Sequence, residues 1–187
     1  MKTSLTQKRG FTLVEAMVAI SILSLAVTGP LVIASKGLDS AIYAKDQITA
    51  FYLAQEAIEY VRNVRDTNRI TGAAWLNGLD ACLPDASGNL QPCEIDARKT
   101  DFTSPGAIQV CPVGTCDPLT FDADNTSSWY GMYGYGIGNP TKFTRTITID
   151  NRAGASKQAA VSVTIAWNTN LFSPPRTFTV QEYLFNF

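Results

Sequence analysis

Glu15 is the residue of this chain whose type and position most strongly suggest chemistry. It is the single charged residue in an apolar run from residue 11 to residue 34. On insertion scales, a glutamate costs roughly 2.5–3.5 kcal/mol at the centre of a membrane helix and somewhat less near its edge. An unpaired Glu15 therefore needs a partner of opposite charge, and an amine is the obvious one.

A cut after Gly10 would supply that amine. Phe11 would become the N-terminal residue and Glu15 the fifth, one helical turn further in, so the Glu15 carboxylate can meet the amino group of an adjacent copy. Lys8 and Arg9 form a basic flank immediately before the junction. The basic flank, the Gly-Phe junction, the fifth-position glutamate and the long apolar tail together resemble the class III signal of type IV pilins and type II secretion pseudopilins.

The resemblance implies a processing route and a set of partners. A membrane aspartyl prepilin peptidase would remove residues 1–10 and methylate the amine of Phe11, so the chain would be the substrate of this chemistry. Glu15 would then act in assembly by neutralising the Phe11 amine of a neighbouring subunit. The implied partners are other pilin subunits, the prepilin peptidase and an inner-membrane assembly platform. No cofactor is expected.

Two simpler readings of the N-terminus are a secretory signal peptide and a plain signal anchor. A cleaved secretory signal would have a shorter apolar segment ending in a small-x-small site, whereas residues 11–34 make a helix of roughly 36 Å against a hydrocarbon core of about 30 Å. Neither reading explains an acid so close to the start of the run. Lys2, Lys8 and Arg9, with no acid among the first ten residues, place that end in the cytoplasm and the body of the chain outside.

Charge and composition argue against nucleic-acid binding in bulk and against catalysis. Loss of the leader, which holds three of fifteen basic residues and none of sixteen acids, lowers the formal net charge from −1 to −4. A basic strip remains at Arg62, Arg65 and Arg69. We interpret it as a solvated helix face or as a set of ion pairs to the head. Binding of nucleic acid is left open. There is no histidine, no nucleophile elbow and no Walker loop, so we do not expect an enzyme.

Residues 35–68 keep a helical rhythm beyond the apolar run. One apolar stripe is expected to pack on a head: Ala44, Ile48, Phe51, Ala54, Ile58 and Val61. The polar face would carry Lys45, Asp46, Gln55, Glu56, Glu59 and Arg62. Gly29 and Pro30 predict a kink rather than an end, since hydroxyls at Ser21, Ser24 and Thr28 can satisfy freed backbone groups. The helix is expected to stop between residues 67 and 72.

Residues 71–140 are rich in loops and contain all four cysteines. Two local bridges, Cys82 with Cys93 and Cys111 with Cys116, are the simplest of the three possible pairings. A four-cysteine zinc site is the alternative, but neither pair has zinc-ribbon spacing. An acidic cluster is formed by Asp117, Asp122, Asp124 and Asn125. We interpret it as an exposed turn rather than a calcium site, so no metal ligand is predicted.

The aromatic-glycine segment is either a recognition loop or an edge strand whose aromatic residues cover the sheet, and packing is the favoured interpretation. Its members are Trp129, Tyr130, Tyr133 and Tyr135, with Gly131, Gly134, Gly136 and Gly138. Residues 141–187 alternate as three strands, 143–150, 161–167 and 176–185, with turn chemistry at 151–154. This tail resembles minor pilins of the pilus-modification class and the pseudopilin I group.

The sequence therefore predicts an α+β fold, in which a long N-terminal helix packs on a small antiparallel β-sheet head. The expected segments are a leader (1–10), a transmembrane or filament-core helix (11–34), an amphipathic stalk (35–68), a disulfide-bonded loop region (71–140) and a β-meander (141–187). The expected function is that of a minor pilin or pseudopilin in a type IV pilus-like filament. The chain is expected to cross the inner or cytoplasmic membrane once and then to enter an extracellular or periplasmic filament. Alternatives are a tip-located module that binds a surface, a secreted substrate or DNA, a type II secretion pseudopilin, and an anchored domain that never assembles.

Overall fold

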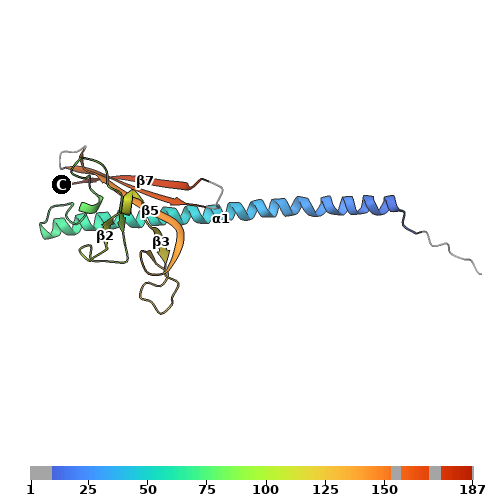
Figure 1. The fold of residues 1–187 in the computed structure, drawn as a ribbon, viewed down its shortest axis with the longest axis horizontal. Coiled ribbons are helices and arrows are strands. Elements are labelled where there is room, and N and C mark those ends of the chain that lie inside the picture. The colour runs from blue at the N-terminus through green and yellow to red at the C-terminus, as the bar shows by residue number, and fades with distance from the viewer. Residues whose placement is uncertain (1–9, 153–156, 169–173, 187) are drawn as a thin grey trace, which may run out of the picture. The chain divides into compact units, whose positions relative to one another are not determined.

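A computed structural model describes residues 10–152, 157–168 and 174–186 (Figure 1). The chain divides into two compact units, residues 1–45 and residues 46–187. Helix α1 (Leu13–Thr71) contributes to both units. The basic flank predicted at Lys8 and Arg9 lies outside the described residues, as does part of the turn expected at 151–154.

In the first unit, α1 begins directly after Thr12, and up to residue 34 it carries one charged residue, Glu15. It is long and apolar enough to cross a membrane, with a mean hydropathy of 2.2 over its most apolar window. The helix continues through Pro30. The hydroxyls of Ser21 and Thr28 donate to the carbonyls of Met17 and Ser24, at 2.8 and 2.7 Å. Pro30 has no N–H, so the carbonyl of Ala26 lacks its helical donor. The carbonyls of Met17 and Ser24 lie before it in the chain.

The second unit is the head, in which residues 46–71 of α1 pack on an antiparallel sheet (Figure 1). The central strand is β5 (Asn139–Asp150), with β6 (Gln158–Trp167) and then β7 (Arg176–Phe185) along one edge. Along its other edge run two short pairs: β1 (Cys93–Ile95) with β2 (Ile108–Val110), and β3 (Pro118–Phe121) with β4 (Tyr133–Gly134). Two 3₁₀ turns, η1 (Asp80–Cys82) and η2 (Pro112–Gly114), lie in the loops. The predicted α+β architecture of helix and antiparallel sheet is confirmed.

The core forms where the inward faces of β5 and β6 meet α1. The register runs without a shift from Phe143 opposite Trp167 to Asp150 opposite Ala160. The period-two alternation of the sequence turns one set of side chains toward the helix: Phe143, Arg145, Ile147, Ile149, Val161, Val163, Ile165 and Trp167. The buried residues of α1 that face them include Ala50, Leu53, Ala54, Ala57, Ile58, Val61 and Val64.

The predicted helix stripe is wrong in its first half. Ile48 and Phe51 are 57% and 42% exposed, whereas Ala54, Ile58 and Val61 are buried as expected. The contact face is centred on alanines, because small side chains let the sheet approach the helix closely. A stripe predicted from the largest apolar residues is therefore rotated around α1 away from the face that contacts the sheet.

Arg145 is a charged residue at the centre of this core, with 0% exposure. Its guanidinium donates to the carbonyl of Leu53 on α1 at 3.0 Å and to that of Ile95 on β1 at 2.6 Å. It also pairs with the Glu56 carboxylate at 2.6 Å. One side chain thus joins α1, β1 and β5. Glu56, predicted on the polar face, keeps a partly exposed side chain and still pairs with this buried arginine.

Two further ion pairs tie α1 to the sheet. Lys142 Nζ lies 2.6 Å from Asp46, which is only 4% exposed although it was predicted on the polar face. The charge of Lys142 explains how a carboxylate can be buried there. Arg62 binds Glu182 of β7 at 2.6 Å and also pairs with Glu59. This member of the basic strip therefore joins α1 to the sheet.

The C-terminus of α1 lies within the range predicted for it. Thr71 is its last residue, and Gly72 follows with a φ of 74°. The amide of Ala73 donates to the carbonyl of Asn68 at 2.8 Å, which satisfies one of the last carbonyls of the helix.

The role of Arg145 yields a stability prediction. Arg145→Ala is expected to lower the free energy of unfolding by about 3–5 kcal/mol, since it opens a cavity and removes the side-chain donor from the buried carbonyls of Leu53 and Ile95. Glu56→Gln keeps an oxygen acceptor at a partly exposed position and is expected to cost only about 1 kcal/mol. Urea unfolding of the full chain in detergent, followed by tryptophan fluorescence, measures both. Equal stability of Arg145→Ala and the wild type would contradict this role.

Candidate functional site

The candidate processing junction is exposed and lies outside the helix. Gly10, Phe11 and Thr12 are not helical, and all three are exposed. The hydroxyl of Thr12 accepts a hydrogen bond from the backbone N–H of Glu15 at 3.3 Å. The carbonyl of Thr12 accepts one from the N–H of Ala16 at 3.1 Å. Thr12 therefore occupies the N-cap position of α1.

Glu15 sits in the first turn of α1, where the partial positive charge of the helix end favours an acid. Among the described residues its carboxylate has no ion pair, and its side chain is exposed. Within the described part of a single copy, this charge is therefore unpaired in an apolar segment. That arrangement suits a contact with a positive group of another molecule.

A comparison with known families identifies this segment. Residues 5–29 match the family model described as the prokaryotic N-terminal methylation motif. The match supports a type IV pilin-like protein. It spans the junction, Glu15 and most of the apolar run, and it does not reach the head, so it selects no subgroup of minor pilins. Comparison with curated proteins and with solved structures found no match.

The pilin-like motif carries consequences for the rest of the chain. It implies processing by a prepilin peptidase and assembly with other pilins. Together with the apolar helix and the disulfide-bonded β head, it supports a membrane-anchored filament subunit. It also suggests a structural subunit rather than an enzyme.

Two disulfides stabilise the loops of the pilin-like head. Cys82, at the end of η1, is bonded to Cys93 at the start of β1, and Cys111 is bonded to Cys116 across η2. The Glu94 carboxylate lies close to the sulfur atoms of the second pair. These sulfurs are bonded to each other, so they do not act as thiolate ligands for zinc.

The acidic cluster is not the uniform exposed turn that we expected. Asp122 is buried, and one of its oxygens accepts the N–H of Asp124 at 2.9 Å. Asp124 in turn accepts the N–H and the hydroxyl of Thr126, and these hydrogen bonds lower the pKa of its carboxyl. The two aspartates therefore shape the loop through local hydrogen bonds.

The aromatic-glycine segment is held in place by Arg98. The Arg98 guanidinium forms a two-pronged pair with Asp96, with N···O distances of 2.9 and 2.8 Å, and donates to the carbonyls of Tyr135 and Ile137. It also lies 5.1 Å from the ring centroid of Trp129. Burial opposes ionisation of Asp96, but the hydrogen bonds and charge of Arg98 outweigh it and lower its pKa. The segment is therefore ordered by a buried ion pair.

The aromatic side chains of this segment divide into two groups. Tyr133 packs on Phe121 and Phe143, with centroids 5.0 and 6.4 Å away, and burial raises the pKa of Tyr135 to about 12. These two residues pack against the sheet, as the favoured interpretation states. In contrast, Tyr130 is 60% exposed, and Met132 and Ile137 are also exposed. The tip of the segment thus offers an apolar surface on an ordered support.

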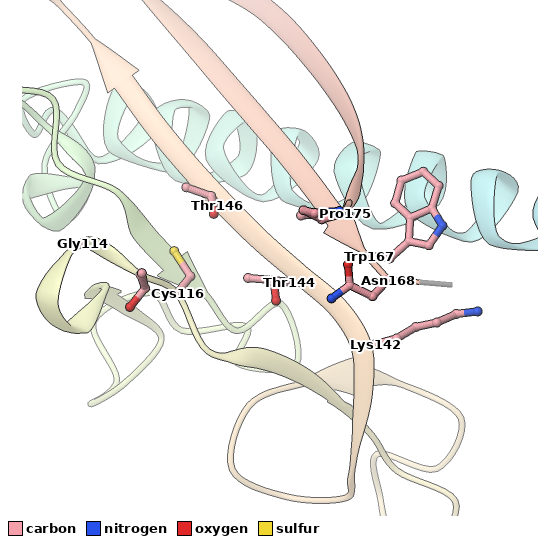
Figure 2. Close-up of a pocket in the computed structure, with 10 residues that line it drawn as sticks. Gly114, Cys116, Lys142, Thr144, Thr146, Trp167, Asn168 and Pro175 are labelled. Carbon is pink, nitrogen blue, oxygen red and sulfur yellow. The ribbon is translucent and has the colours of Figure 1, made fainter. Parts of the chain in front are cut away.

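A shallow groove of about 350 Å³ lies on the sheet between β5, the end of β6 and the loop of the second disulfide (Figure 2). Thr144, Thr146 and Asn168 supply its polar groups, beside Cys116 and Pro175. Lys142 also lines it, but its amine is paired with Asp46. The groove can form hydrogen bonds, and it holds no pair of titratable groups suited to acid–base catalysis. Sequence alternation predicts the threonine face of β5 but cannot show which loop lies beside it.

Gly134 offers a test of how Arg98 orders the segment. A Cβ at this position would lie 1.9 Å from Nε of Arg98. Gly134→Ala is therefore expected to destabilise the head by about 1–3 kcal/mol, and to have little effect in an Arg98→Ala background. Gly136→Ala is the matched control, since Gly136 has a φ of 80° but open space around it, and should cost about 1 kcal/mol. Additive effects of Gly134→Ala and Arg98→Ala in urea unfolding would contradict the contact.

Proposed function

We propose that this chain is a structural subunit of a type IV pilus-like filament, of the minor pilin or pseudopilin kind, processed after Gly10 and assembled through its N-terminal helix. The proposal rests on one observation: residues 5–29 match the methylation motif, and the Gly10–Phe11 junction within them is exposed and non-helical. The adjoining segment up to residue 34 is apolar apart from Glu15, whose carboxylate has no ion pair among the described residues. Such an arrangement fits a protein that is first stored in a membrane and then packed helix against helix.

In this proposal residues 1–10 are a leader that remains in the cytoplasm, and Phe11 becomes the methylated N-terminus. Residues 11–34 first span the membrane and later pack in the filament core. The head, with its two disulfides, is exported, which suits the oxidising conditions outside the cytoplasm. The partners are the prepilin peptidase, other pilin subunits and the inner-membrane assembly platform.

A tip-located binding role is the second candidate. The exposed side chains of Tyr130, Met132 and Ile137 favour it, because apolar groups on an ordered loop are a common contact surface. This role uses the same anchor and adds a contact at the head.

The processing route is tested by the intact mass and N-terminal sequence of the protein recovered from its native membrane. A chain that begins at N-methylated Phe11 supports the proposal. A chain that retains residues 1–10, or one that begins near residue 30, overturns it.

Glu15 gives the assembly prediction. Glu15→Gln should leave membrane insertion intact or improved, because a neutral amide is easier to bury than a carboxylate. Incorporation into filaments should fall by roughly tenfold or more, the scale expected for loss of one charge-assisted hydrogen bond. Immunoblots of sheared filaments against membrane pools measure the ratio. Asp39→Asn, which neutralises the next acid along α1, is the matched control. Normal incorporation of the Glu15→Gln protein would show that the charge pairing is wrong.

A further inference from the structure

Thr12 lies two residues past the proposed scissile bond and decides where α1 begins. Its hydroxyl accepts the N–H of Glu15, the third residue of the helix, and its carbonyl accepts the N–H of Ala16. The described chain before it, Gly10 and Phe11, is not helical. An N-cap residue has non-helical backbone angles by definition, so capping at Thr12 fixes the helix start at Leu13.

The position of the helix start matters for cleavage. Within a helix, backbone amides and carbonyls are bonded along the axis and the chain is coiled, whereas cleavage concentrates at exposed segments without such bonds. No proline separates the junction from α1, and the residues that follow are apolar and favour helix in a membrane. Of the described residues before Thr12, Gly10 opposes growth of the helix toward the leader. The Thr12 cap is the described interaction that stops the helix short of the junction.

We propose that Thr12 is a positioning residue for leader removal: its hydroxyl caps α1 and thereby keeps the Gly10–Phe11 peptide bond in non-helical, accessible backbone. The proposal rests on the proposed function, since it assumes that this bond is cut. The reaction is a hydrolysis, in which water adds across the bond, Gly10 becomes a carboxylate and Phe11 retains the nitrogen as its amine. Thr12 takes no part in the bond changes.

The cap also separates two tasks within one turn of helix. It uses the backbone N–H of Glu15 and not the Glu15 carboxylate. The carboxylate stays available for an amine of another subunit after cleavage. Substitutions at Thr12 should therefore change the rate of processing, while substitutions at Glu15 should change assembly.

Rates of leader removal test the proposal. Thr12→Ala, Thr12→Ser and Thr12→Asn are introduced into the full-length precursor in its own membrane, and conversion to the shorter chain is followed by pulse–chase. Only the membrane-inserted fraction is counted. Thr12→Ala should slow cleavage by roughly two- to thirtyfold, the range that corresponds to loss of one cap, while serine and asparagine, which both cap helices, should keep the wild-type rate.

Each other outcome has a defined meaning. An unchanged rate for Thr12→Ala overturns the proposal. Slow cleavage of both Thr12→Ala and Thr12→Asn also overturns it, because the threonine side chain would then be read by its shape rather than through the cap. A wild-type precursor that is never cleaved overturns the proposed function itself, and so is distinguished from failure of the capping role.

Discussion

The head is organised around the guanidinium of Arg145, which lies where helix α1 meets the sheet. A buried arginine is tolerated only when hydrogen-bond acceptors surround it, and here α1 and β1 each supply a carbonyl while Glu56 supplies a carboxylate. These acceptors come from α1 and β1, and Arg145 itself from β5, so three elements must be in place together. The geometry of Arg145 therefore couples formation of the helix contact to formation of the sheet.

Charge pairs repeat along the same contact. Asp46 with Lys142, Glu56 with Arg145 and Arg62 with Glu182 join successive levels of α1 to the strands. Between them lie Ala50, Ala54 and Ala57, whose small side chains allow close packing but constrain the register less than the directional ion pairs do. The ion pairs supply the register. A head attached to a long helix needs such a register, because any displacement along α1 would expose its alanine face.

The sequence was sufficient for the architecture and insufficient for these pairs. Alternation along 143–150 and 161–167 predicted the strands and their inward faces, because successive side chains of a strand point to opposite faces and neighbouring residues show this pattern. The partners of Asp46 and Glu56 lie about ninety residues away along the chain, as Lys142 and Arg145, and no local pattern shows them. The helix stripe failed for the same reason, since Ile48 and Phe51 look like core until the position of the sheet is known. At the N-terminus, Thr12 and Glu15 have the spacing of a capping box, a signal that could have been read from the sequence.

The two disulfides of the head each join a cysteine to its nearest neighbour along the chain, across 11 and 5 residues. The entropy cost of closing a loop grows with its length, so these two pairs are also the most probable encounters in the unfolded chain. Both other pairings of the four cysteines require longer loops. In the proposed topology the leader stays in the cytoplasm and the part of the head nearest α1 is exported first, so Cys93 meets Cys82 before either remaining cysteine follows. The head can therefore oxidise to its native pairing with little reshuffling of thiols, even where no isomerase is at hand.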